Sequence, residues 1–171
     1  HEGHRRSGVP ACPMAEGLST TPIFSSFLFV PNDFRPMPNI LKLSPYQASI
    51  LADRPDCCIE ESLANAIAEP GVPLDDETAD SIAFEVASLK RSFGETYEAG
   101  QYVYKPERIN VSTLSNLGRL ALLDCWEGST IDRMTDEWHD DPLAVSRLRR
   151  SMVALHGKLQ AVGFNPSPVW F

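Results

Sequence analysis

Residues Pro142–Val162 have the sequence PLAVSRLRRSMVALHGKLQAV, which shows the most regular apolar spacing in the chain. Apolar residues recur here at intervals of three and four, an a/d pattern that places them along one face of an α-helix. Asp141 and Pro142 are typical of a helix start, and Gly163 is typical of a helix end. The segment predicts a long amphipathic helix with one apolar stripe, formed by Val145, Leu148, Met152, Leu155, Leu159 and Val162.

The rest of the sequence predicts five shorter helices around this one. Ser44, Pro45 and Gln47 form a capping-box pattern, Asp56 is placed to cap a second helix, and the acidic cluster 75–77 favours the start of a third. We expect these helices at residues 44–53, 56–69, 75–94, 114–126 and 129–138. The predicted fold is mainly α (α+β), a helical bundle-like domain with a small sheet.

Two segments have the composition of strands rather than helices. In QYVYKPERINV, residues 101–111, β-branched and aromatic residues flank a turn at Pro106-Glu107. The segment Thr20–Val30 is similarly β-rich and is bounded by prolines. The sequence therefore predicts a sheet of two or three strands.

The beginning of the chain shows no pattern of secondary structure. We expect residues 1–13 to be a disordered leader and residues 14–171 to form a single globular domain. The first residues lack the apolar core of a signal peptide, and the longest apolar run, Pro22–Pro31, is far shorter than the roughly 20 residues of a membrane span. These features predict a cytoplasmic protein without a membrane partner.

The negative charge of the chain is concentrated in one segment. Residues 53–85 contain ten acidic residues and one arginine, a net charge of −9, whereas the whole chain carries −8. Such a surface attracts basic proteins and repels nucleic acids and anionic membranes. The leading hypothesis is a non-enzymatic regulatory or inhibitory protein that binds a basic protein surface; the alternative is a solvated face that maintains solubility. The candidate partner-binding residues are Asp56, Glu60, Glu61, Asp75, Asp76, Glu77, Asp80 and Glu85.

The second hypothesis is DNA binding by residues 129–158, which resemble a helix-turn-helix. Arg147, Arg149 and Arg150 would then lie on the recognition helix and contact phosphates or guanine edges. Four residues occupy positions of the motif that are usually apolar: Met134, Trp138, Val145 and Leu148.

Other features of this segment favour two ordinary bundle helices. His139 stands where the turn usually has glycine, and Asp140 replaces a usually apolar residue. Residues 112–163 contain six basic and seven acidic residues, so the region lacks the positive charge expected of a strong DNA binder. If the apolar stripe of residues 145–162 is not covered internally, it also permits a homodimer.

No catalytic motif is found in the sequence. It lacks a nucleophile elbow, a glycine-rich phosphate loop and an H-E-x-x-H pair, and no cofactor or metal is expected. An enzyme remains the third hypothesis, because a site assembled from distant residues leaves no motif in a single sequence. The four cysteines have no C-x-x-C spacing and are expected to be small buried residues in a reducing compartment. Tyr102, Tyr104 and the terminal segment 169–171 either pack on the core or form part of a partner site.

Overall fold

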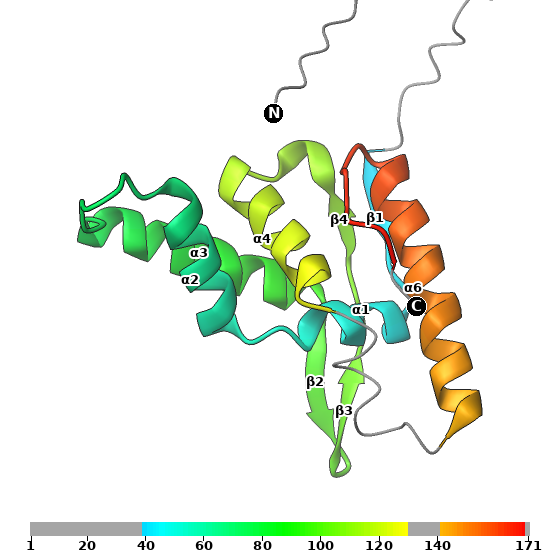
Figure 1. The fold of residues 1–171 in the computed structure, drawn as a ribbon. Helices are drawn as coiled ribbons and strands as arrows, with labels where there is room; N and C mark the ends of the chain where they lie inside the picture. Colours follow the sequence, from blue (N-terminus) through cyan, green and yellow to red (C-terminus); the bar gives the residue numbers. More distant parts are fainter. Residues whose placement is uncertain (1–38, 130–140, 170–171) are drawn as a thin grey trace, which may run out of the picture. The chain divides into compact units, whose positions relative to one another are not determined.

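The computed structural model describes residues 39–129 and 141–169 of the 171-residue chain, all within the second of its two compact units, 35–171. Five α-helices lie in this part of the chain (Figure 1). They are α1 (Pro45–Ala52), α2 (Asp56–Ile67), α3 (Asp76–Ser92), α4 (Asn116–Glu127) and α6 (Pro142–Ala161). The predicted mainly helical α+β fold is confirmed.

Several predictions fall on the remaining residues. The leader 1–13, the strand Thr20–Val30 and residues 130–138 of the predicted fifth helix lie outside the described part of the chain. Ser129 is described and follows the end of α4, where its buried hydroxyl donates to the carbonyl oxygens of Ile50 at 3.0 Å and Cys125 at 2.6 Å.

The helix starts largely follow their sequence signals. The Ser44 hydroxyl accepts from the backbone N–H of Gln47 at 3.2 Å, and the Gln47 side chain accepts from the Ser44 N–H at 3.1 Å, which completes the capping box of α1. Asp141 caps α6 by accepting from two backbone N–H groups, with Pro142 in the first position. Both predicted starts are confirmed.

The expected cap of α2 is wrong. Pro55 occupies the N-cap position, and Asp56 is already the first residue of the helix. Its carboxylate makes no capping hydrogen bond and instead lies 3.2 Å from the ammonium of Lys90 on α3. The acidic side chain still stabilises the positive end of the helix dipole at this position.

Within the described ranges, four short strands form two separate antiparallel pairs. β1 (Ile40–Lys42) pairs with β4 (Arg108–Asn110), and β2 (Glu95–Glu98) pairs with β3 (Gln101–Tyr104). The strands predicted on either side of Pro106 exist, but they do not pair with each other. Ala99 and Gly100, with φ of 50° and 86°, form the tight connection that pairs β3 with β2 instead.

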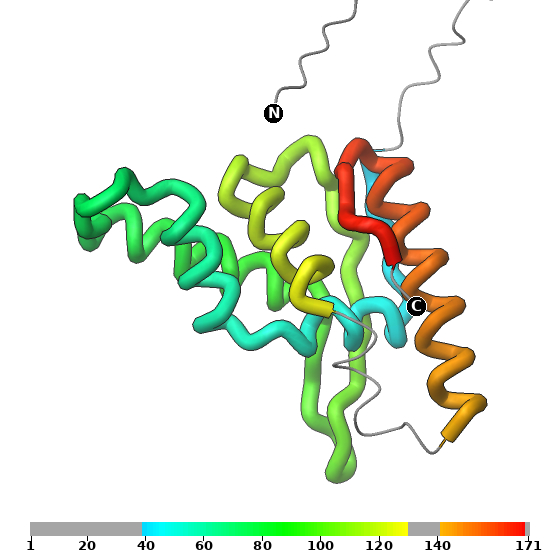
Figure 2. Tube along the Cα trace, in the orientation of Figure 1, coloured from blue at the N-terminus to red at the C-terminus, as the bar shows by residue number. Residues whose placement is uncertain are grey.

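The hydrophobic core draws on every described helix. α3 contacts α2 and α4, while α1 bridges α4 and α6 (Figures 1 and 2). Five side chains of the predicted apolar stripe are buried within this chain: Leu148, Met152, Leu155, Leu159 and Val162. These five side chains are therefore not available to a homodimer through residues 145–162.

Candidate functional site

The eight candidate acidic residues do not form one patch, because α2 and α3 run antiparallel. The ion pair with Lys90 places Asp56 beside the C-terminal part of α3. Asp76 begins the same helix fourteen residues earlier, about 21 Å away at a rise of 1.5 Å per residue. Asp56 thus belongs to the helix junction rather than to a shared binding face.

Asp75 also has a structural partner within the fold. Its carboxylate accepts from the backbone N–H of Thr78 at 2.7 Å and so caps α3. Hydrogen bonds from Thr78 are the main cause that holds the pKa of Asp75 below its usual value. Asp75 is therefore ionised at neutral pH and adds to the negative potential of this surface, but its carboxylate already accepts the capping hydrogen bond of α3.

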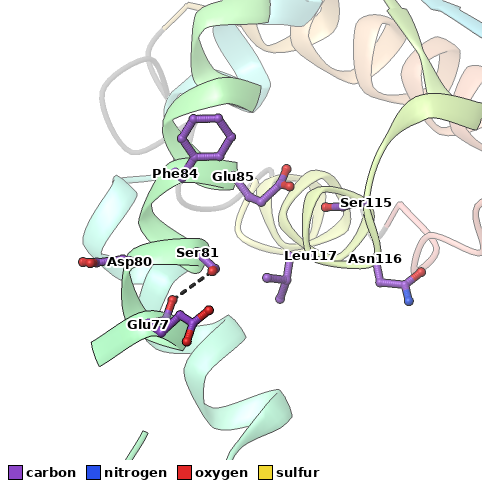
Figure 3. Close-up of a pocket in the computed structure, with 8 residues that line it drawn as sticks. All are labelled: Glu77, Asp80, Ser81, Phe84, Glu85, Ser115, Asn116 and Leu117. Atoms are coloured by element: carbon purple, nitrogen blue, oxygen red, sulfur yellow. Dashed lines mark hydrogen bonds between the residues drawn. The ribbon is translucent and has the colours of Figure 1, made fainter. Parts of the chain in front are cut away.

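Glu77, Asp80 and Glu85 are among the residues that line an open groove between α3 and the start of α4, with a volume of about 760 Å³ (Figure 3). Phe84 lies among them and is 65% exposed, unusually open for a phenylalanine. The other described lining residues are uncharged: Ser81, Ser115, Asn116 and Leu117. The groove therefore combines an exposed aromatic ring with three carboxylates.

Glu85 is held close to the first turn of α4. A methyl group at Gly118 would lie 3.1 Å from the Glu85 Oε2 atom, so the glycine leaves room for this carboxylate. The N-terminus of α4, capped by Ser115, carries partial positive charge and favours the carboxylate there. Figure 3 shows Glu85 directed towards this end of α4.

The remaining acidic candidates lie elsewhere on the helical pair. Glu61 and Asp76 are exposed and Glu60 is half-buried, but none of these three lines the groove. Phe84 was not recognised in the sequence as part of a site. The available signal was an aromatic residue outside the apolar stripe of its own helix, since the buried positions of α3 are Ile82, Val86 and Leu89.

The three arginines of the DNA-binding hypothesis are all exposed on α6. At 100° per residue, Arg147 and Arg150 point about 60° apart, whereas Arg149 points about 160° away from Arg147. The Arg147 guanidinium also lies 4.4 Å from the centre of the Tyr46 ring, a cation–π contact within the chain. Arg150 also donates from its Nε atom to the Ser146 carbonyl at 3.4 Å. Two arginines therefore share a face, and both already have contacts within the chain.

The described cysteines differ in their surroundings. Cys125 is buried, as expected, and burial is the main cause that raises the pKa of its thiol to about 12. Cys57 is exposed on the first turn of α2, on the side away from Ile59 and Leu63, so its predicted burial is wrong. Within residues 39–129 and 141–169, no three potential ligands gather in a way that could hold a metal ion.

The aromatic candidates divide between core and surface. Tyr104 and Val169 pack against the core, and burial is the main cause that raises the pKa of Tyr104. Tyr102 is 65% exposed on the β2–β3 hairpin, where its ring meets that of Tyr97 edge-on at a centroid distance of 5.1 Å. The hairpin thus presents a tyrosine pair to solvent.

Comparisons with protein-family models, curated proteins and solved structures found no match to this chain. None of the helices in the described ranges combines the length and apolar character needed to cross a membrane. A fold alone does not define an activity, so the function must be argued from the chemistry of the sites.

Proposed function

We propose that this protein is a non-enzymatic regulator or inhibitor that binds a basic segment of a partner protein in the groove between α3 and α4. The observation that carries the proposal is the exposed Phe84 ring beside the carboxylates of Glu77, Asp80 and Glu85. Exposing an aromatic side chain to water is unfavourable, and burying it in an interface therefore contributes favourable free energy to binding.

The charges around Phe84 define the chemistry of the partner. Lysine and arginine side chains would pair with the carboxylates at the rim, while an apolar side chain would cover the ring and Leu117. The surrounding negative charge of residues 53–85 would speed the encounter with a basic segment and make binding sensitive to salt. The binding set is therefore Glu77, Asp80, Phe84 and Glu85, whereas Asp56 and Asp75 serve the fold.

The test uses defined peptides that alternate arginine or lysine with apolar residues, measured by fluorescence anisotropy at low and physiological salt. Phe84→Ala should weaken binding by at least tenfold, and Glu77→Lys combined with Asp80→Lys should abolish it. The matched controls are Glu69→Lys and Glu107→Lys, both exposed and outside the groove. If the control charge reversals cost as much affinity as the groove reversals, only net charge matters and the proposed site is wrong.

DNA binding by α6 is the alternative, and the shared exposed face of Arg147 and Arg150 is the observation that favours it. Alanine at both positions should then weaken duplex binding and reduce its salt dependence. Arg149→Ala, on another side of the helix, should have a smaller effect. Equal effects of all three substitutions would exclude a specific recognition face.

The compartment that fits this proposal is the cytoplasm. Cys57, Cys58 and Cys125 are free thiols in the described part of the chain, and Cys57 is exposed to oxidants. A reducing environment keeps such thiols from being oxidised to disulfides.

A further inference from the structure

A second groove, of about 550 Å³, lies between β1, β4 and the end of α6. β1 runs beside the C-terminal half of α6 (Figures 1 and 2). Three of the lining side chains are cations, and none is a carboxylate. The described lining residues are Asn39, Ile40, Leu41, Lys42, Arg108, Lys158, Ala161 and Val162.

Two of these cations stand directly opposite each other in the strand pair. Lys42 is the register partner of Arg108, and both side chains are exposed. The Val111 N–H donates to the Asn39 carbonyl at 2.7 Å, so these two residues form a hydrogen-bonded pair of the ladder. Hydrogen-bonded and non-hydrogen-bonded pairs alternate, which makes Lys42 and Arg108, three positions along, a non-hydrogen-bonded pair. Side chains approach each other most closely in pairs of this kind. Like charges opposite each other destabilise an antiparallel pair.

Nothing in the described structure compensates this repulsion. Neither Lys42 nor Arg108 has a side-chain hydrogen bond or ion pair to another described residue. A rule of sheet pairing is thus violated without a visible compensating contact, which is typical of a functional position.

Lys158 adds a third positive charge from α6. Its Nζ atom donates to the Lys42 carbonyl and to the Gln47 Oε1 atom, both at 2.7 Å. An ammonium group has three donors, so two of them fix Lys158 and one is left for a further acceptor. The charge in the last turn of α6 also offsets the negative end of that helix dipole beside the groove.

We propose that this groove binds a small phosphate monoester, with its phosphate between Lys42 and Arg108 and its apolar part on Ile40 and Val162. The guanidinium fork of Arg108 matches phosphate geometry, and a charge of about −2 balances the two opposed cations. The groove has the volume of small-molecule sites and offers apolar lining beside the cations. This site is separate from the α3–α4 groove and does not rest on the function proposed for it.

Phenyl phosphate is the probe, titrated into the whole chain and followed by calorimetry and by the amide resonances of β1, β4 and the end of α6. Lys42→Gln and Arg108→Gln should each weaken binding by about tenfold or more, because each removes a charge-assisted hydrogen bond. Without ligand, the same variants should unfold at the same or a higher temperature than the original chain, since the repulsion is relieved. With the probe, the original chain should gain more thermal stability than either of these two variants.

Arg91→Gln is the control, because Arg91 is exposed on α3 and does not line the groove. Inorganic phosphate should bind more weakly than phenyl phosphate, and benzoate, with one negative charge, should bind more weakly still. Equal binding of benzoate would overturn the assignment to phosphate, and equal binding of inorganic phosphate would remove the role of Ile40 and Val162. Absence of saturable binding, or unchanged affinity in Lys42→Gln and Arg108→Gln, would overturn the site itself.

Discussion

Lys90 donates from its Nζ atom to the backbone carbonyl of Ala52, the last residue of α1, at 2.7 Å. The same nitrogen hydrogen-bonds the carbonyl of Arg54 and lies 3.2 Å from a carboxylate oxygen of Asp56. The Lys90 side chain is only 16% exposed. One ammonium group on α3 therefore holds the connection between α1 and α2.

Replacing Lys90 by methionine tests this junction, because methionine keeps most of the apolar stem and removes the charge. Two backbone carbonyls would lose their donor, so the free energy of unfolding should fall by about 1–3 kcal/mol in urea denaturation. Arg91→Met, on the exposed neighbour, should cost less than about 0.5 kcal/mol. A loss of the same size in both variants would mean that the Lys90 hydrogen bonds contribute little.

Gly94 occupies a position that no other residue can fill without distortion. Its φ is 65°, and a methyl group there would lie 2.0 Å from the carbonyl oxygen of Lys105. Gly94→Ala should therefore lower the free energy of unfolding by more than the roughly 1–2 kcal/mol cost of the left-handed conformation itself. Gly100→Ala is the matched control, since Gly100 has a φ of 86° but open space around it. Equal losses would contradict the steric clash at Lys105.

The thiols should react in an order set by their exposure. Cys57 is exposed, whereas Cys125 is buried with a thiol pKa of about 12, which leaves about one molecule in ten thousand as thiolate at pH 8. Alkylation with iodoacetamide, followed by peptide mass spectrometry, should label Cys57 and spare Cys125 until the chain is unfolded. Similar labelling rates at the two positions in the native protein would contradict the burial of Cys125.

The cap of α3 should make stability depend on pH in the acidic range. Because the pKa of Asp75 is lower in the folded chain than in the unfolded chain, its contribution is complete above the unfolded value of about 3.9 and is lost as pH falls through the folded value. The stability difference between the original chain and Asp75→Ala should be constant near neutral pH and shrink below about pH 4. Asp75→Asn keeps a hydrogen-bond acceptor at this position but no titrating group. The stability difference between Asp75→Asn and Asp75→Ala should therefore not change over the same pH range.

Helices with local start signals could be predicted from the sequence because the signals and the residues they bind are three or four positions apart. Ser44 and Gln47 in α1, and Asp141 with Pro142 in α6, are examples. The apolar stripe predicted at residues 145–162 likewise identified five side chains that are buried, because periodicity reports directly on which face of a helix is covered.

The pairing of the strands and the groove could not be predicted in this way. β1 has three residues, too few to show a period, and its pairing with β4 joins distant parts of the sequence. The β2–β3 turn has Ala99 with a positive φ, a residue that carries no signal for that conformation. The acidic groove depends on the approach of α4 to Glu85 and Phe84, which is a property of packing and not of the α3 sequence.

The pairing of β1 with β4 sets an order for folding. Leu41 faces Ile109, so this pair closes a loop of about 70 residues, and the loss of chain entropy makes the closure costly unless contacts formed earlier already bring the two strands together. The α2–α3 hairpin and the β2–β3 hairpin need only short loops and can form first. We expect the strand pair to form after the helices, so substitutions at Leu41 or Ile109 should speed unfolding while leaving the folding rate nearly unchanged.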